Sequence, residues 1–315
     1  MNIGDLTYAF SSQKSPIQKI TSNFLTQKEI QLFIKRDDLI HAEISGNKWR
    51  KLKYNLIEAK KTNQSTLLTF GGAFSNHISA VAAAGAEFGF RTIGIIRGEQ
   101  VLPLNPTLSF AKKCGMDLHF INRTLYRNKN KPDYQNRLKN QFGDFFLLPE
   151  GGTNCLALEG CSEIIQEVKN KHIDTDYYCV SCGTGGTISG IISGLNGEKK
   201  VLGFSALKGD FLTTEVFKLL NECVGKEFSN WEILTEYHFG GYAKWTPELI
   251  NFINQLYEET TIPFDPIYTG KMLFGIYDLI RKDFFEKGSS LMVIHTGGLQ
   301  GIQGFNNRFG NLIKT

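Results

Sequence analysis

The chain has 315 residues, and its 35 lysines and arginines against 31 aspartates and glutamates give a formal charge of +4. This surplus is too small to indicate a nucleic-acid partner. A hydrophobic content of 41% with 21% charged residues is typical of a globular protein and excludes a disordered chain. No apolar run is long enough to span a bilayer and the first residues lack a secretory signal pattern, so we expect a cytoplasmic protein without a membrane partner.

The first half of the chain alternates short apolar runs with helical patterns. The runs that we expect to be strands are 66–70, 91–96, 118–121 and 145–148. The segments with helical spacing are 78–88, 106–113 and 133–141, and an earlier helix runs to residue 60. Alternation of this kind indicates βαβ units and a parallel sheet.

The same alternation begins again in the second half. We expect strands at 176–180, 200–206, 231–235 and 291–295, and helices at 157–169, 188–195, 247–258 and 271–285. The sequence therefore predicts a two-domain α/β fold, each domain an open, mostly parallel sheet flanked by helices. The boundary is expected near residues 151–152, with a smaller domain over residues 48–152 and a larger one over residues 1–47 and 153–315.

A candidate reactive lysine lies near the start of the helix that runs to residue 60. Lys48 is four residues before Leu52, which belongs to the apolar stripe, so the two side chains share the inward face. Lys51 shares a face with Asn55 and Glu58, which we expect to be solvated. Desolvation lowers the pKa of an inward lysine and makes its amine a nucleophile able to form a Schiff base. The alternative is a lysine whose ammonium reaches solvent from the first helical turn.

Two glycine-containing loops follow predicted strands. In the first, Gly71 and Gly72 precede Ser75 and Asn76, either of which could cap the next helix. Helix N-termini favour anions and glycine allows a ligand to approach the backbone, although an ordinary turn and cap explain the same residues. His77 is only two residues from Ser75, so a Ser–His catalytic pair is not indicated, since such close helix positions face different ways.

The second loop, residues 181–187, places glycines and hydroxyls between a strand and a helix. Successive backbone N–H groups and hydroxyls in this position form a cradle for a phosphate. No lysine follows the glycines, which excludes the P-loop, and the dinucleotide fingerprint fails because its third glycine position is Ile188. The pattern favours a single phosphate, and a loop that only reverses the chain is the alternative.

The cysteines and histidines do not indicate a metal site. Cys179 and Cys182 form a C-x-x-C pair, but no second pair at that spacing completes a zinc site, and no H-x-H or H-E-x-x-H spacing occurs. Cys179 lies inside a predicted strand rather than at a helix start, so we expect buried thiols instead of a redox pair. Six cysteines in a chain of this length do not make a disulfide framework, and we expect a reduced protein.

Two further segments have polar side chains that could meet a ligand. One is basic, with Asp133 as its acidic residue and with the cations Arg123, Arg127, Lys129, Lys131, Arg137 and Lys139. An anionic partner would explain it, but the low net charge favours a solvated loop and helix face. The other follows the last predicted strand, where Thr296 lies at a usual ligand position of open α/β sheets and could bond a polar ring atom.

In this order the motifs resemble the pyridoxal-phosphate (PLP) enzymes of fold type II, specifically the family of 1-aminocyclopropane-1-carboxylate (ACC) deaminase and D-cysteine desulfhydrase. The similarity runs nearly from end to end. The matching segments are the glycine loop and residues 34–38, 46–48, 50–52, 75–76, 267–271 and 295–298. The resemblance implies pyridoxal 5'-phosphate as cofactor, a small amino-acid substrate and a homodimer.

The resemblance also assigns roles to individual residues. It makes Lys48 the Schiff-base lysine, in agreement with the helical-face argument, and excludes Lys51 from that role. The positions that match catalytic groups are Lys48, Ser75, Tyr242 and Tyr268. Those that match cofactor-binding groups are Thr184, Gly185, Gly186 and Thr187 at the phosphate, Asn76 at the ring hydroxyl and Thr296 at the pyridine nitrogen. Those that match the substrate side are Ser75, Asn76 and His77.

Departures from the family pattern bear on the reaction. Ser45 stands where the family has a second glycine, and Val293 stands where ACC deaminases carry a second catalytic tyrosine. His77 and Thr269 match the desulfhydrase branch. We therefore expect PLP-dependent β-elimination of D-cysteine to pyruvate, ammonia and sulfide. ACC deamination is the first alternative, and PLP binding with little catalysis is an alternative of another class.

Overall fold

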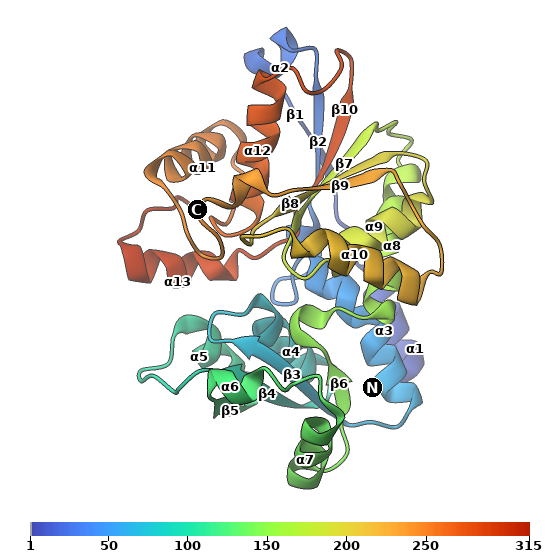
Figure 1. Cartoon of the computed structure of the whole chain (residues 1–315), viewed down its shortest axis with the longest axis vertical. Helices are drawn as coiled ribbons and strands as arrows, with labels where there is room; N and C mark the ends of the chain where they lie inside the picture. The colour runs from blue at the N-terminus through green and yellow to red at the C-terminus, as the bar shows by residue number, and fades with distance from the viewer. Residues whose placement is uncertain (1) are drawn as a thin grey trace.

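A computed structural model describes residues 2–315, which form two β-sheets flanked by helices (Figure 1). The strands of the larger sheet are β1 (Ile17–Ile20), β2 (Gln31–Lys35), β7 (Tyr177–Cys182), β8 (Lys200–Ser205), β9 (Trp231–Leu234) and β10 (Ser290–Ile294). Their order is β1-β2-β10-β7-β8-β9. Neighbouring strands are parallel except β1 and β2, which are antiparallel.

The smaller sheet has four parallel strands in the order β5-β4-β3-β6. These are β3 (Thr66–Gly72), β4 (Arg91–Arg97), β5 (Asp117–Ile121) and β6 (Phe146–Leu148). One continuous segment supplies all four, whereas the larger sheet takes strands from both sides of that segment in the sequence. All the strands predicted from apolar runs are present, with ends within two residues of the expected ones, so the α/β fold with mostly parallel sheets is confirmed.

Helices pack around both sheets, with α4 to α7 around the smaller one in the lower part of Figure 1. Those before β7 are α1 (Ile3–Ser12), α2 (Asn23–Gln27), α3 (Asn47–Lys61), α4 (Asn76–Phe88), α5 (Pro106–Lys113), α6 (Arg123–Tyr126), α7 (Pro132–Phe142) and α8 (Cys155–Lys169). Those after β7 are α9 (Gly186–Leu195), α10 (Phe211–Cys223), α11 (Pro247–Thr260), α12 (Thr269–Arg281) and α13 (Gln300–Phe309). Short 3-10 helices are η1 (Asp37–Leu39), η2 (Glu150–Gly152) and η3 (Glu236–His238). Between residues 2 and 315, no helix combines the length and apolarity that crossing a membrane requires.

The differences from the predicted elements lie mainly at the edges of the fold. The pattern does not predict β1 and β2, which lie at one edge of the larger sheet and carry exposed polar side chains, nor α1, α10 and α13. The helix expected over residues 271–285 begins at Thr269 and ends at Arg281. It cannot continue to residue 285 because Asp283 has a left-handed backbone, with φ of 54°.

Each sheet has one place where the strand order reverses. In the larger sheet β10 lies beside β7, and in the smaller sheet β6 lies beside β3, although neither pair is adjacent in the sequence. At such a switch point the connections after neighbouring strands leave in opposite directions and open a crevice. The loops after β3, β7 and β10 are the ones that carry the sequence motifs, so topology alone directs those motifs to two crevices.

A buried ion network fastens the start of α3 to the larger sheet. Asp37 accepts hydrogen bonds from Arg50 through Nε and Nη2, both at 3.1 Å, and forms an ion pair with Lys35 at 3.2 Å. Arg50 and Lys35 also contact Glu167 on α8. Burial alone would raise the pKa of Asp37, but Arg50 and Lys35 more than offset it and lower the pKa to about 2. The charged segment at residues 34–38 therefore has a structural role, since it orients the helix that carries Lys48.

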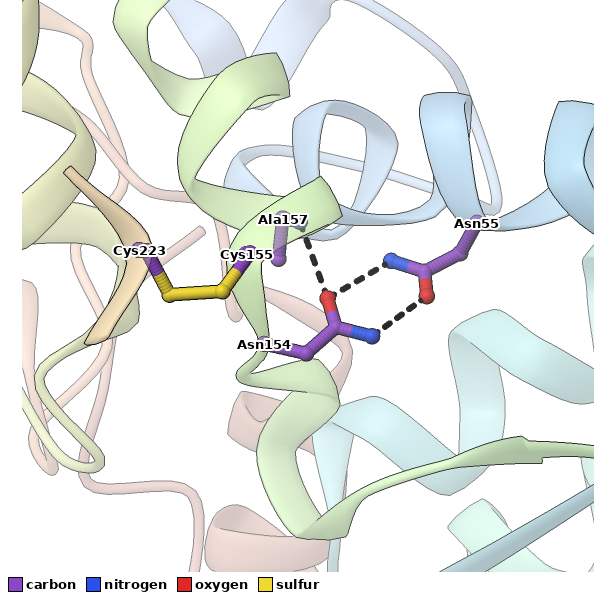
Figure 2. Close-up of a disulfide and its surroundings, with 5 residues drawn as sticks. All are labelled: Asn55, Asn154, Cys155, Ala157 and Cys223. Atoms are coloured by element: carbon purple, nitrogen blue, oxygen red, sulfur yellow. Dashed lines mark hydrogen bonds between the residues drawn. A yellow bond between two sulfur atoms is a disulfide. The ribbon is translucent and has the colours of Figure 1, made fainter.

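A disulfide joins Cys155 at the start of α8 to Cys223 at the end of α10 (Figure 2). The prediction of a reduced protein is therefore wrong. The two residues are 68 positions apart, and only the fold brings their Cα atoms to 5.1 Å. Cys179 and Cys182 are buried free thiols, as the sequence predicted.

Next to the disulfide, two asparagines join α3 to α8 (Figure 2). Asn55 and Asn154 exchange two amide hydrogen bonds, of 3.2 and 2.7 Å. The side-chain oxygen of Asn154 also accepts a hydrogen bond of 2.9 Å from the backbone N–H of Ala157 and so caps α8. Asn55 is fully buried, and its amide is satisfied by this partner rather than by water.

Candidate active site

A cavity of about 830 Å³ opens where the loops after three strands meet. Residues 72–77 begin at the end of β3, residues 181–188 begin at the end of β7 and residues 296–298 follow β10, so the cavity has walls from both sheets. All the site residues named from the sequence line it: Lys48, Ser75, Asn76, His77, Thr184, Gly185, Gly186, Thr187, Tyr242, Tyr268 and Thr296. Within residues 2–315 no cluster of His, Cys, Asp and Glu side chains could hold a metal ion.

The first turn of α3 is fixed to two of these loops. The backbone N–H of Asn47 donates to the carbonyl of Thr296 at 3.1 Å, and its side-chain amide donates to Oγ1 of Thr187 at 2.9 Å. Gly46 has φ of 65°, and a Cβ at this position would collide with the carbonyl of Thr296. Glycine is therefore required at position 46, while Ser45, the departure from the family pattern, is accommodated against Gly297.

Lys48 is half-buried at the cavity wall, and its Nζ lies 3.5 Å from the carbonyl oxygen of Gly151. Burial lowers the pKa of Lys48 well below its ordinary value, and the positive charge of Lys51 lowers it further. No carboxylate pairs with Lys48 within the part of the chain that the structure describes. Its amine is thus available as a nucleophile and a base.

Lys51 is buried too, and the prediction that it lies on a solvated face is wrong. Its side chain is 2% exposed, and its Nζ donates to the carbonyl of Gly151 and to Oγ1 of Thr153, both at 3.1 Å. The sequence could have indicated this burial, because Lys51 is three positions after Lys48 and the two lysines therefore share one face of the helix. Asn55 misled the prediction because it is a buried polar residue.

The glycine loop after β7 leaves room for an anion at the N-terminus of α9. Gly185 has φ of 79°, and no side chain caps the helix, so its first N–H groups are free. A Cβ on Gly186 would lie 2.8 Å from Oγ1 of Thr153 and 3.1 Å from Nζ of Lys51. The hydroxyls of Thr153 and Thr184 are 2.6 Å apart beside it. Free N–H groups, hydroxyls and a lysine together form a site suited to a phosphate.

Ser75 and Asn76 lie at the start of α4. The hydroxyl of Ser75 accepts a hydrogen bond of 3.3 Å from the backbone N–H of Ile78, so the capping role considered from the sequence is present. Ser75 also lines the cavity, and the cap does not exclude a second contact there. The side chain of Asn76 faces Gly298, where a Cβ would lie 3.1 Å from its Nδ2.

His77 is 1% exposed, and neither ring nitrogen has a hydrogen-bond partner among residues 2–315. Burial lowers the pKa of His77 well below its ordinary value, with Lys48 and Lys51 acting in the same direction and only the nearby Pro149 carbonyl opposing them. The ring is therefore neutral. A buried imidazole without a partner in the wall of a cavity is suited to bond a ligand there.

On the wall of the larger sheet, two hydroxyls bridge its switch point. Ser181 lies near the end of β7 and Thr296 follows β10, and their hydroxyl oxygens are 3.1 Å apart. Both residues are buried, at 6% and 7% exposure. A neutral hydroxyl in this position can donate a hydrogen bond to an aromatic ring nitrogen without placing a charge against it.

Two tyrosines close the cavity on another side. Asp265 accepts hydrogen bonds of 2.7 to 3.0 Å from the backbone N–H groups of residues 267–269 and so fixes the turn that presents Tyr268. The ring of Tyr268 packs on Gly183, and the ring centroid of Tyr242 is 6.1 Å away. Burial raises the pKa of Tyr268 well above its ordinary value, as does Tyr242, so its hydroxyl keeps its proton.

These groups fit pyridoxal phosphate. The space at Gly186, which a Cβ would fill, suits a single phosphate group. The amine of Lys48, which has no carboxylate partner among residues 2–315, can react with an aldehyde such as that of the cofactor. The unpartnered nitrogens of His77 and the hydroxyl of Thr296 supply polar groups for the rest of the ring and for a substrate. Val293 is fully buried in the core and does not line the cavity. Among residues 2–315, the tyrosines that line the cavity are Tyr242 and Tyr268.

Comparisons with known proteins agree with this fit. The profile of the family described as "Pyridoxal-phosphate dependent enzyme" matches residues 12–297. The mitochondrial bifunctional D-cysteine desulfhydrase/1-aminocyclopropane-1-carboxylate deaminase of Arabidopsis thaliana is 30% identical over 293 residues, covering 86% of this chain and 73% of that protein. A crystal structure of an ACC deaminase homologue superimposes with a TM-score of 0.82 at 26% identity, over 98% of this chain and 99% of that one.

A more distant structure, a hydrogen sulfide-producing enzyme from Fusobacterium nucleatum, has a TM-score of 0.69 and 14% identity, over 93% of this chain and 98% of that one. At that identity the similarity concerns the fold alone. The fold is that of PLP enzymes of fold type II, and the cofactor predicted from the sequence is confirmed. The chain belongs to the family of pyridoxal-phosphate-dependent enzymes, as a homologue of ACC deaminases and D-cysteine desulfhydrases.

Proposed function

We propose that this enzyme converts D-cysteine and water to pyruvate, ammonia and hydrogen sulfide. The observation that carries the proposal is the unpaired amine of Lys48, with its lowered pKa, in a cavity whose phenols are Tyr242 and Tyr268. A neutral amine can remove the α-proton of an amino acid. ACC has no α-proton, so opening its ring needs other proton-transfer groups. Val293 lies in the core where the related deaminases have a tyrosine, and it supplies no such group.

The bound cofactor supplies an electron sink for the reaction. The N-terminus of α9 and Lys51 would hold its phosphate, and Asn76 and Thr296 would bind along its ring. Lys48 Nζ takes the proton from the α-carbon of the substrate. Its lowered pKa favours the neutral amine, which is the form that can accept that proton.

The substrate is oriented by the start of α4. Ser75 and Asn76 bind its carboxylate, where the positive end of the helix dipole stabilises a negative charge. Tyr268 keeps its proton because its pKa is raised, and its hydroxyl donates a hydrogen bond to the sulfur, which leaves as hydrosulfide with the electron pair of the β-carbon–sulfur bond. His77, neutral and without a hydrogen-bond partner among residues 2–315, accepts a hydrogen bond from the substrate on the same side of the cavity.

The test is a substrate panel assayed for keto acid with the PLP-loaded enzyme. D-cysteine should be cleaved faster than ACC by a factor of about 10² to 10⁴, the usual cost of a missing proton-transfer group. L-cysteine should be the poorer enantiomer, because Lys48 reaches the α-proton from one face of the substrate. Equal or faster turnover of ACC would overturn the proposal. Lys48→Ala should abolish turnover, and Lys61→Ala, which removes an exposed lysine of the same helix, is the control.

A further inference from the structure

Three cations gather on the wall of the cavity that belongs to the smaller sheet. Arg97 ends β4, Arg123 begins α6, and Lys129 lies in the loop after α6. All three line the cavity that contains Lys48. Arg123 is exposed, as expected for a solvated face, and Lys129 is half-buried, but both also line the cavity, whereas Arg127 of the same segment lies outside it.

Carboxylates only partly neutralise these cations. Across residues 2–315, neither Arg97 nor Arg123 has a carboxylate within ion-pair distance, and Lys129 pairs with Glu150 at 3.2 Å. The other carboxylate in the cavity wall is Glu215, on α10. Cationic side chains in the cavity wall thus outnumber carboxylates. Because like charges that meet in one cavity repel each other, a bound anion would stabilise this arrangement.

A buried aromatic ring holds two of the cations in place. The guanidinium carbon of Arg97 lies 5.5 Å from the ring centroid of Tyr126, and Nζ of Lys129 lies 5.1 Å from the same centroid. Tyr126 is 2% exposed and packs edge-on against Phe70 of β3, with centroids 6.0 Å apart. Cation–ring contacts of this kind restrict flexible side chains, so the two charges are held at the cavity instead of moving freely in solvent.

The other anions of the site have binding groups elsewhere. The phosphate of the cofactor is matched by the glycine loop, α9 and Lys51, all on the side of the larger sheet. The substrate carboxylate is matched by the start of α4 under the proposed function. Arg97 lies close to the start of α4, because its Nη2 is 3.4 Å from the position that a Cβ on Gly72 would take, and Gly72 ends the strand before α4. Arg97 therefore lies on the side of the cavity where α4 begins and not at the phosphate loop, and Lys129 shares the Tyr126 ring with it.

We propose that Arg97, Arg123 and Lys129 recognise a negative charge on the β-substituent of the substrate, as in a phosphate or sulfate ester of D-serine. The proposal rests on the proposed function and extends its substrates beyond D-cysteine. With the phosphate ester the balance is amino acid plus water to pyruvate, ammonia and inorganic phosphate. The α-proton goes to Lys48 Nζ, the β-carbon–oxygen bond breaks, and its electron pair leaves with the phosphate. Guanidinium groups stabilise the charge that develops on the departing oxygen.

Binding and turnover by the PLP-loaded enzyme test this. O-phospho-D-serine and D-serine O-sulfate should bind at least about tenfold more tightly than D-alanine, as expected for charge-assisted hydrogen bonds. Binding is read from the change in visible absorbance, and turnover from keto acid. In Arg97→Gln and Arg123→Gln the advantage of the charged esters should fall about tenfold each, while the KM of uncharged β-chloro-D-alanine stays the same.

Arg127→Gln is the matched control, because it removes the same charge from the same segment outside the cavity. If the advantage of the charged esters falls equally in this control, then only the overall positive charge of the segment acts, and the proposal is overturned. An equal loss for charged and uncharged substrates would assign the arginines to the α-carboxylate, and would also overturn it.

Failure of the proposed function has a different signature. If the charged esters bind tightly in an arginine-dependent manner but neither they nor D-cysteine yields keto acid, then the recognition is supported and the reaction is wrong. If D-cysteine yields pyruvate and the charged esters bind no more tightly than D-alanine, then the reaction is right and this inference is wrong. Melting temperatures of all variants show whether each has folded.

Discussion

The cavity wall from the larger sheet and the wall from the smaller sheet are built from different kinds of group. The first consists of a glycine loop, a helix N-terminus and buried hydroxyls, supported by the half-buried Lys48 and the buried Lys51 of α3. The second carries the exposed guanidinium groups of Arg97 and Arg123. A cofactor of constant shape is matched by backbone and short side chains that cannot move far. Long side chains at the end of β4 and the start of α6 carry charge to the cavity, where they can meet a substituent that changes from substrate to substrate.

The difference is visible in the covalent and ionic connections behind each wall. The paired amides of Asn55 and Asn154 and the disulfide (Figure 2) lie behind the first wall, as does the ion network of Asp37. Behind the second, the contacts to Arg97 and Lys129 are those with Tyr126 and one partly buried ion pair, between Lys129 and Glu150. We therefore expect variants of the first wall to change stability or cofactor retention, and variants of the second to change substrate preference.

The largest effect is expected at the two lysines of the first wall. Lys48→Ala should lower turnover by a factor of about 10² to 10⁴ or more, because it removes both the proton acceptor and the covalent link to the cofactor. Lys51→Ala should keep that link and release the cofactor more readily on dialysis, because its Nζ adjoins the phosphate loop. Borohydride reduction followed by peptide mapping distinguishes them. A label on Lys51 would contradict the assignment.

The next effect concerns the ion network. Asp37→Asn should reduce the free energy of unfolding at pH 7 by about 3 to 5 kcal/mol, because Arg50 and Lys35 would lose a buried partner. The pKa of Asp37 is about 2 in the folded protein against an ordinary 3.8. Its contribution is therefore complete above pH 4 or so, and it disappears as the pH falls through 2.

Urea unfolding at several pH values tests this prediction. The variant should lose stability less steeply than the parent as the pH falls from 4 to 2. Asp283→Asn is the control, because that carboxylate is 77% exposed and pairs with Lys28 at the surface. It should change stability by less than about 1 kcal/mol. If both variants lose the same free energy of unfolding, then the buried ion network stabilises the protein no more than the surface ion pair does.

Removal of the disulfide should have a somewhat smaller effect. Cys155→Ser with Cys223→Ser should reduce the free energy of unfolding by about 2 to 4 kcal/mol, because the cross-link restricts the unfolded chain. The bond also fixes the start of α8 next to Thr153, so the double variant should release PLP faster. Cys114→Ser, which removes a free cysteine, is the control. Unfolding and dialysis with and without a reductant give the same comparison for the parent protein.

The first wall was also the one that the sequence predicted best. Strands β7 and β10 are fully buried, so they appear as continuous apolar runs, and the glycines after β7 mark the phosphate loop. Lys48 followed from its spacing to Leu52, whose side chain is fully buried. Local order along the chain was enough in these cases, because each element and the motif that follows it are adjacent in sequence.

What the sequence did not predict depends on contacts between distant segments. Lys51 was assigned to solvent because Asn55 looked like a solvated residue, whereas Asn154, 99 positions away, satisfies its amide. The cations of the second wall looked like surface charges, since no local pattern shows which loops face the cavity. The cysteines of the disulfide have no spacing signal, because their pairing depends on how α8 and α10 pack.

The smallest effect on stability is expected at Ser75, where the two walls meet the substrate. Ser75→Ala should reduce the free energy of unfolding by about 1 kcal/mol, the usual contribution of a helix cap. Thr246→Ala is a closely matched control, because Thr246 caps α11 with a hydrogen bond of the same 3.3 Å and lies outside the cavity.

The two variants should differ in catalysis although they lose similar stability. Only Ser75→Ala should reduce kcat/KM for D-cysteine, and its retention of PLP on dialysis should match that of the parent, because the phosphate is held at α9. If both variants keep full turnover, Ser75 is a cap and nothing more. If Ser75→Ala loses PLP in proportion to turnover, the residue belongs with the rigid wall that holds the cofactor, and the substrate carboxylate must be bound by other groups.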